Sequence, residues 1–376
     1  MRQFIIVLLA AAVLTNAAAT SQAPGQNYAA GAAPYFITAA HLTGPDNGAD
    51  LIVSNHNSEN LSVLRNKGDG TFQPATAIAA GKAPTAVICA DFTGLGKRDL
   101  AVALSGEDAV IILLNKGNGT FQEPRKITVA PAPGSLAAAD FNGDGRDDLI
   151  SASLTANQAT LLLSQGADDF AAPQKLELGY VPFFVTTADL NNDGNADFIT
   201  CPWQRSGQTQ LGVYLGNGDG TFAEPKRFYA GQNAYQVASG DFNHDGKLDL
   251  VTANNFSRGA HVLLGTGDGN FQTAVNYPIG DCSAVITGDF NNDGHPDFAV
   301  TNSVEAKVTV MLGKGDGTFP TRQDFAVARG PVMLAVADFD RDGKRDLATA
   351  NTTANNVTVL LGKTLDFLKI AAPVKK

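Results

Sequence analysis

The stretch from Asp140 to Leu149 reads DFNGDGRDDL, and it decides the fold because the same ten-residue phrase recurs along the chain. The intact copies begin at Asp140, Asp189, Asp241, Asp289 and Asp338, and two degraded copies begin at His41 and Asp91. Successive copies start 48 to 52 residues apart. The phrase therefore divides the chain into seven units of similar length.

Each unit contains four short apolar or β-rich runs separated by turn residues. In the third unit these runs are Ser135–Phe141, Asp148–Leu154, Ala159–Ser164 and Lys175–Gly179. Such a pattern predicts a four-stranded antiparallel meander, and a period of 40–50 residues is typical of propeller blades. We therefore predict an all-β fold, a seven-bladed β-propeller of four-stranded antiparallel blades. A β-solenoid is the alternative, although its repeats are normally shorter.

A second phrase marks the expected turn between the third and fourth strands of a unit. It reads NKGDGTF from Asn66, GNGDGTF from Gly216 and GKGDGTF from Gly313. Glycine supplies the positive φ that tight hairpin turns require. The closing phenylalanine is expected to pack between neighbouring sheets.

The aspartate phrase has the ligand spacing of a calcium loop. Ca²⁺ takes six to eight oxygen ligands, and side-chain oxygens at positions 1, 3 and 5 of a tight loop converge on one point. Glycine at position 6 permits the sharp turn, position 7 offers its carbonyl oxygen, and an aspartate stands at position 9. Asx-turns without an ion are the alternative, but repeated clusters of acids repel one another unless a cation lies among them.

The intact copies predict about five bound Ca²⁺ ions per chain. The predicted ligands are Asp140, Asn142, Asp144, the Arg146 carbonyl and Asp148; Asp189, Asn191, Asp193, the Asn195 carbonyl and Asp197; Asp241, Asn243, Asp245, the Lys247 carbonyl and Asp249; Asp289, Asn291, Asp293, the His295 carbonyl and Asp297; and Asp338, Asp340, Asp342, the Lys344 carbonyl and Asp346. The last loop carries four carboxylates and is expected to bind most tightly, unless Arg341 and Arg345 offset them.

The two degraded copies are expected to hold no ion. Thr93 and Leu95 stand at positions 3 and 5 of the second copy, and His41 replaces the leading aspartate of the first.

The aspartate phrase, the Gly-Asp-Gly-Thr-Phe turn and the Gly-x-x-Pro link at Gly81–Pro84 resemble FG-GAP/VCBS repeats, which also build the N-terminal propeller of integrin α subunits. The resemblance covers nearly all of the chain after residue 33 and implies a calcium-binding, seven-bladed propeller. It does not imply a single activity, because the family includes adhesion modules, lectins and scaffolds of polysaccharide lyases.

The N-terminal sequence has the features of a secretory signal. Arg2 precedes an apolar run from Phe4 to Leu14, and small residues follow at Ala17–Ala19. This pattern predicts a signal peptide over residues 1–19, cleaved after Ala19, then an N-terminal extension over 20–33 and the propeller over 34–376. An uncleaved membrane anchor is the alternative, and whether Ser21–Ala33 adds an outer strand to the last blade is left open. The run is short for a membrane span, so the mature protein is expected to be secreted, without a membrane span and monomeric.

Charge and cysteine content narrow the possible partners. The net charge of −10 argues against nucleic acid, since phosphate binding needs clustered basic residues. Seventeen of the 37 acidic residues lie in the intact phrases, and five Ca²⁺ ions would neutralise the chain. The three cysteines match no metal or redox motif; free buried thiols are expected, with one disulfide as the alternative.

The face opposite the aspartate loops is the predicted ligand face. Tyr180, Trp203, Tyr235 and Arg258 lie in its loops and links, in the fourth and fifth units. They form a candidate site for an extracellular protein or glycan, or they fill gaps between blades.

The sequence contains no nucleophile or metalloprotease motif. We therefore expect a binding or adhesion module rather than an enzyme. The alternative is a carbohydrate-active protein, either a lectin or a polysaccharide lyase, that uses the face opposite the calcium loops.

Overall fold

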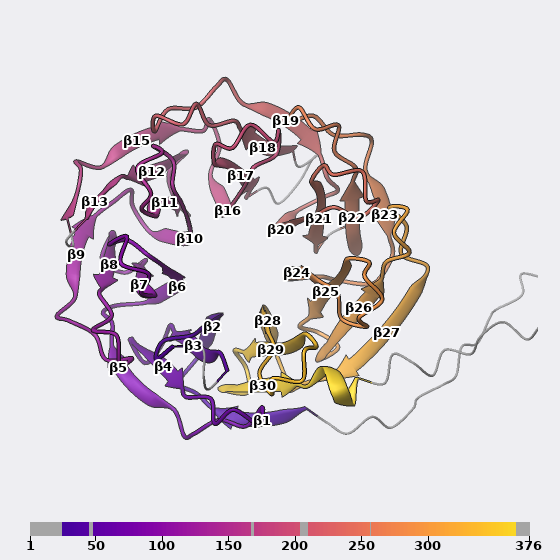
Figure 1. Ribbon diagram of the computed structural model, residues 1–376, viewed down its shortest axis with the longest axis horizontal. Helices are drawn as coiled ribbons and strands as arrows, with labels where there is room; N and C mark the ends of the chain where they lie inside the picture. The colour runs from indigo at the N-terminus through magenta and orange to yellow at the C-terminus, as the bar shows by residue number, and fades with distance from the viewer. Residues whose placement is uncertain (1–24, 45–47, 167–168, 204–209, 256, 366–376) are drawn as a thin grey trace, which may run out of the picture.

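The computed structural model describes residues 25–44, 48–166, 169–203, 210–255 and 257–365. Seven four-stranded antiparallel sheets stand in a ring around a common centre (Figure 1). The predicted all-β, seven-bladed propeller is confirmed. None of the described segments is a helix long and apolar enough to cross a membrane. The predicted signal peptide, residues 1–19, lies outside the described residues.

The two inner strands of each blade carry most of the core. The innermost strands, in blade order, are β2 (Pro34–Ala40), β6 (Pro84–Ala90), β10 (Pro133–Ala139), β16 (Pro182–Ala188), β20 (Ala234–Gly240), β24 (Val285–Gly288) and β28 (Pro331–Ala337). The second strands are β3 (Asp50–Asn55), β7 (Asp99–Leu104), β11 (Asp148–Ser153), β17 (Asp197–Pro202), β21 (Asp249–Asn254), β25 (Asp297–Asn302) and β29 (Asp346–Asn351). Every residue of these second strands is buried, because each strand is covered by a blade on both faces.

The two outer strands complete each blade. The third strands are β4 (Asn60–Leu64), β8 (Ala109–Leu113), β12 (Gln158–Leu162), β18 (Gln210–Tyr214), β22 (Gly259–Leu263), β26 (Lys307–Leu312) and β30 (Asn356–Leu360). The outermost strands are β5 (Thr76–Ala79), β9 (Arg125–Thr128), β15 (Gln174–Glu177), β19 (Lys226–Tyr229), β23 (Val275–Tyr277), β27 (Thr321–Ala326) and, for the seventh blade, β1 (Gln26–Ala29). A small hairpin of β13 (Ser164–Gly166) and β14 (Asp169–Phe170) replaces the turn in the third blade, and a 3₁₀ turn, η2 (Gly362–Thr364), follows β30.

The ring closes through its N-terminal strand. β1 pairs with β30 from Gln26↔Val359 to Ala29↔Asn356, so the last blade combines both ends of the described chain. β1 lies within the expected N-terminal extension, so part of this extension is the outer strand that the sequence left open. The physical reason is that β30 would otherwise be an open edge with unpaired backbone groups.

Aromatic pairs join the blades on the side of the aspartate loops. In four blades the turn phenylalanine packs edge-on against the phenylalanine at position 2 of the preceding loop. This contact joins Phe72 to Phe339 with ring centroids 5.5 Å apart and Phe222 to Phe141 at 5.5 Å. The expectation that these phenylalanines pack between sheets is confirmed.

Candidate metal centres

The five intact aspartate loops share one backbone arrangement, set by the side chain at position 1. In the third blade, Gly143 N–H donates to Asp140 Oδ1 and Gly145 N–H donates to Asp140 Oδ2, both at 2.7 Å. The position-6 glycine donates to the position-1 aspartate in the other four loops at 2.9–3.0 Å. Gly145 has a φ of 82°, which L side chains rarely adopt. The loop is thus coiled around its own carboxylates.

The aspartate at position 9 is buried and connects two turns of its blade. Phe141 N–H donates to Asp148 Oδ2 at 3.0 Å, and Ser164 N–H, at the start of the third-to-fourth-strand turn, donates to Asp148 Oδ1 at 2.7 Å. The aspartate loop and the glycine-rich turn therefore lie on one face of the propeller, as the meander predicts. Position 9 fixes the distance between them.

Burial and nearby acids perturb these position-9 carboxyls. Burial raises the pKa of Asp148, Asp197 and Asp249 to about 6 and that of Asp297 and Asp346 to about 7. The hydrogen bonds from backbone N–H groups act in the opposite direction, and two further aspartates of the same loop raise the pKa again. Each intact loop therefore concentrates negative charge that a cation would relieve.

The seventh loop shows this convergence most directly. Oxygens of Asp338, Asp340 and Asp346 lie within 4.8 Å of one another, and no other such group of three His, Cys, Asp or Glu residues occurs among the described residues. Lys363 Nζ lies 2.6 Å from Asp340 Oδ2. Lys363 lies in the turn that follows β30. Its ammonium group therefore already pairs with the loop that carries the most carboxylates.

The second loop keeps the hydrogen bond from the position-6 glycine to the position-1 aspartate but lacks acids at positions 3 and 5. Asp91 accepts hydrogen bonds from the Thr93 hydroxyl at 3.1 Å and from Gly96 N–H at 2.6 Å. Leu95 takes the place of the position-5 ligand and is 70% exposed. Only Asp91 and Asp99 remain as acids at ligand positions, too few for a calcium site.

In the first blade a cationic side chain contacts the position-9 aspartate. Asp50, at position 9, is buried, and Arg65 Nη1 donates to its Oδ2 at 2.7 Å. The residue before the turn is leucine in the other six blades: Leu114, Leu163, Leu215, Leu264, Leu312 and Leu361. Arg65 thus supplies positive charge to a degraded loop from a position that is otherwise apolar.

The sequence of the chain matches a family of repeats. The FG-GAP-like repeat matches residues 91–151, 140–200, 203–252, 241–300 and 289–349, more than half of the sequence. The chain belongs to the FG-GAP-like repeat family. No curated protein matches it in sequence.

Solved structures similar to this FG-GAP propeller share its fold at low identity. A lectin from Agrocybe aegerita, studied for its specific recognition of non-reducing terminal N-acetylglucosamine, has a TM-score of 0.57 and 21% identity, covering 85% of this chain and 86% of the lectin. BBS1N, solved in complex with ARL6DN, has a TM-score of 0.60 and 11% identity, covering 90% and 97% of the two chains. A second structure of that complex gives 0.61 and 13%, covering 88% and 94%.

The predicted ligand face of the FG-GAP propeller separates into distinct groups. Trp203 stacks on Phe183 with ring centroids 4.9 Å apart, and Tyr235 packs edge-on against Phe183 at 4.8 Å. These three side chains form an aromatic cluster at the ends of β16, β17 and β20 that lie away from the aspartate loops. Arg258, one loop further along the same face, pairs with Asp281 at 3.5 Å.

Tyr180 lies apart from this cluster. Arg227 Nη1 donates to the Tyr180 hydroxyl at 2.7 Å, and the guanidinium carbon lies 4.5 Å from the tyrosine ring centroid. The Tyr180 hydroxyl also shares a hydrogen bond with the hydroxyl of Thr200, and burial raises the pKa of Tyr180. Its contacts are those of a residue that packs within and between blades.

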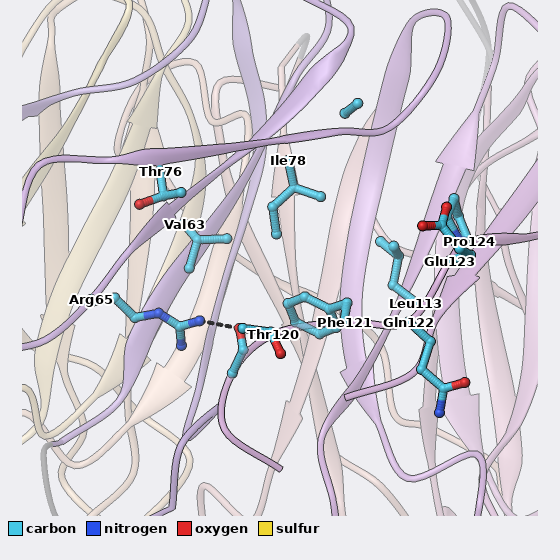
Figure 2. A pocket seen from close by; sticks show the side chains of 12 residues that line it. Val63, Arg65, Thr76, Ile78, Leu113, Thr120, Phe121, Gln122, Glu123 and Pro124 are labelled. Atoms are coloured by element: carbon cyan, nitrogen blue, oxygen red, sulfur yellow. Dashed lines mark hydrogen bonds between the residues drawn. The ribbon is translucent and has the colours of Figure 1, made fainter. Parts of the chain in front are cut away.

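Sequence reasoning missed a groove between the first two blades. It has a volume of about 490 Å³ and is lined by Val63, Arg65, Ile78, Leu113 and Phe121, among others (Figure 2). Arg65 lies at its edge, where Nη2 also donates to the Gly119 carbonyl of the second blade. Strand patterns do not reveal the groove, because it forms between two units.

Replacing Arg65 tests the charge compensation in the first blade. Arg65→Leu, which installs the residue of the other six blades, leaves the buried Asp50 without its cation and should lower the free energy of unfolding by about 2–3 kcal/mol. The loss should be independent of calcium and measurable by urea unfolding. The double variant Arg65→Leu/Asp50→Asn should recover part of the loss. A single variant as stable as the wild type would contradict the compensation.

Proposed function

We propose that this FG-GAP propeller is an exported binding module whose five intact loops each hold a structural Ca²⁺ ion. The observation that carries the proposal is the convergence of acids in these loops, which is closest in the seventh. The ligands would be the side-chain oxygens at positions 1, 3, 5 and 9 and the carbonyl at position 7, the residues named above. Hard carboxylate and amide oxygens are the donors that Ca²⁺ prefers.

The role of the ion would be to stabilise a corner of each blade. The loop joins the first and second strands, and its position-9 aspartate also holds the glycine-rich turn. When bound, calcium supplies positive charge to this cluster and stabilises the folded state by mass action. Extracellular calcium modules bind at roughly 10⁻⁴–10⁻³ M, which suits an exported protein.

A calorimetric titration of the ion-free protein tests the proposal. We expect about five sites per chain, and Asp193→Ala, which removes the position-5 ligand of the fourth loop, should remove one of them. Leu95→Ala, at the matching position of the second loop, is the control and should leave the count unchanged. A count near zero or near seven would overturn the proposal.

Calcium affinity should rise with pH. In the ion-free protein the position-9 carboxyls have a pKa of about 6 to 7, above the ordinary value of 3.8, so calcium must displace protons at lower pH. Because of this raised pKa, the folded ion-free protein binds more protons than the unfolded chain. The free energy of unfolding of the ion-free protein therefore falls as pH rises from 3.8 to about 7. The rise in melting temperature on adding calcium should therefore be larger at about pH 8 than at about pH 5. An equal rise at both pH values would argue against binding by these carboxyls.

The lysine beside the seventh loop should weaken its calcium affinity. Lys363→Met removes the ammonium next to Asp340 and should strengthen binding at this loop about 3- to 10-fold, a modest gain because the lysine is half exposed. The amide resonance of Gly343 reports this loop alone. Lys314→Met is the control, since Lys314 pairs with Asp316 at 3.0 Å in a turn that is not a predicted ligand. Unchanged affinity in the Lys363 variant would show that the lysine does not compete.

A lectin is the second candidate function. The aromatic cluster of Phe183, Trp203 and Tyr235 favours it, because aromatic faces pack against the apolar faces of sugars, and the Agrocybe aegerita lectin shares the propeller fold. A glycan array probed with calcium and with chelator tests this function, with Trp203→Ala as the specific variant. Binding to no glycan, together with capture of a defined extracellular protein, would favour the protein-binding module.

A further inference from the structure

Two of the chain's five histidines meet across the boundary between the fifth and sixth blades. His244 Nε2 lies 2.8 Å from His295 Nδ1, with the ring centroids 5.0 Å apart and the rings tilted by 54°. The contact is exposed to solvent. The two residues are 51 positions apart in sequence, and each belongs to an aspartate loop of its own blade.

The repeat geometry explains why they meet. The side chain at position 4 of a loop reaches the next blade: Asn192 Nδ2 donates to the Gly246 carbonyl at 2.9 Å, and Asn292 Nδ2 donates to the Gly343 carbonyl at 3.5 Å. His244 occupies position 4 of the fifth loop, and His295 occupies position 7 of the sixth. Among the five intact loops, only this boundary carries imidazoles at both positions.

The neighbouring backbone leaves room for both rings. A Cβ on Gly315 would lie 2.4 Å from His295 Nδ1 and 3.0 Å from His244 Cδ2. Glycine at this point of the sixth turn therefore lets the two imidazole nitrogens approach each other. His244 has a φ of 57°, close to the 55° of Asn192 and the 57° of Asn292, so the backbone at position 4 is the same in all three loops.

We propose that His244 Nε2 and His295 Nδ1 form a binding site for a late first-row divalent transition metal ion, of which Zn²⁺ is the representative. Imidazole nitrogen is a preferred ligand for Zn²⁺, Cu²⁺ and Ni²⁺, whereas Ca²⁺ takes oxygen ligands. The site thus uses nitrogen ligands, whereas the calcium loops in which both histidines lie use oxygen ligands. Water would fill the remaining coordination positions.

The observed geometry needs only a small adjustment to bind the ion. Zn–N bonds of about 2.0–2.1 Å at a tetrahedral angle place two ligand nitrogens roughly 3.3 Å apart, a few tenths of an ångström beyond the observed separation. In the ion-free pair one ring donates its N–H to the other. On binding, that ring carries its proton on its other nitrogen instead, so both facing nitrogens present lone pairs to the metal.

Zinc at this position would join two blades. The link would span the fifth and sixth loops. At the two neighbouring boundaries the position-4 side chain instead donates a hydrogen bond to a backbone carbonyl. Zinc should therefore raise the melting temperature of the calcium-loaded protein, because it binds the folded state alone.

The test is a Zn²⁺ titration of the full chain with Ca²⁺ in large excess, so that the carboxylate loops are occupied. We expect one Zn²⁺ site in the wild type. His244→Asn and His295→Asn should each weaken it at least 10-fold, since one imidazole cannot chelate. Both variants use residues found at the same positions of the fourth loop, Asn192 and Asn195, so they should fold.

His56→Asn is the matched control, because His56 is a half-buried histidine of the first blade. Its Nδ1 lies 3.0 Å from Asn57 Oδ1, and its ring lies against Tyr35. This variant should bind Zn²⁺ like the wild type. Changes in the NMR chemical shifts of the His244 and His295 ring nitrogens on adding Zn²⁺ would support the assignment directly. The proposal is overturned if the wild type binds no Zn²⁺ under these conditions, or if both asparagine variants bind it with unchanged affinity.

Discussion

Removing calcium from the purified protein is expected to lower its melting temperature by about 10 to 20 °C. An ion present at 10 to 100 times its dissociation constant adds about 1.4–2.7 kcal/mol to the free energy of unfolding. Five loops together would contribute roughly 7–14 kcal/mol, and a domain of this size loses about 1 °C per 0.7 kcal/mol. The expected change in melting temperature is large because the contributions of five loops in one closed ring add together.

Differential scanning calorimetry of the dialysed protein, with and without added calcium, measures this effect. Magnesium is the control ion, since it resists the dehydration that an all-protein site demands. Asp193→Ala should reduce the shift by about one fifth, in proportion to one lost site among five. Identical melting with and without calcium would mean that the acid clusters are stable without an ion.

Removing the first strand is expected to destabilise the propeller by roughly 4–6 kcal/mol. β1 forms the outer edge of the seventh blade, and its Tyr28 packs edge-on against Phe72 of the first blade at 5.3 Å. Thr358 also donates a hydrogen bond to the Asn27 side chain at 2.7 Å. A chain that lacks residues 20–30 loses all of these contacts and exposes β30 as an open edge.

Urea unfolding and light scattering measure the two consequences, lower stability and association through the free edge. A chain that lacks only residues 20–24 keeps β1 and is the control. Tyr28→Ala keeps the strand but removes the aromatic contact, and it should lose an intermediate amount of stability. If the chain without β1 is as stable and as monomeric as the control, the ring does not depend on this strand for closure.

The fold could be predicted from sequence because its information is local and repeated. The aspartate phrase and the glycine-rich turn bracket two strands in each unit, so their spacing gives the blade count and the strand order. The sequence left open whether Ser21–Ala33 adds an outer strand, because Gln26–Ala29 has no apolar alternation and its partner β30 lies more than 300 residues away. A short polar strand is recognisable only once an unpaired edge is known to exist.

For the candidate sites too, contacts within one loop could be predicted from sequence, whereas contacts between turns or blades could not. The ligand positions within one loop follow from spacing, because all of them lie within nine residues. The contacts of Arg65 with Asp50 and of Lys363 with Asp340 join different turns of a blade, and the pair of His244 and His295 joins two blades. Tyr180 could not be separated from Trp203 and Tyr235 in sequence, because its place between blades depends on Arg227 of the outermost strand.

Five of the seven loops are proposed to hold calcium, and the other two are not. A crystal structure grown with calcium, with an anomalous difference map, tests this loop by loop. We expect strong peaks in the third to seventh loops, among the carboxylates that begin at Asp140, Asp189, Asp241, Asp289 and Asp338, and none beside Asp50 or Asp91. An empty map at these five loops, or peaks of equal strength in all seven, would contradict this proposal.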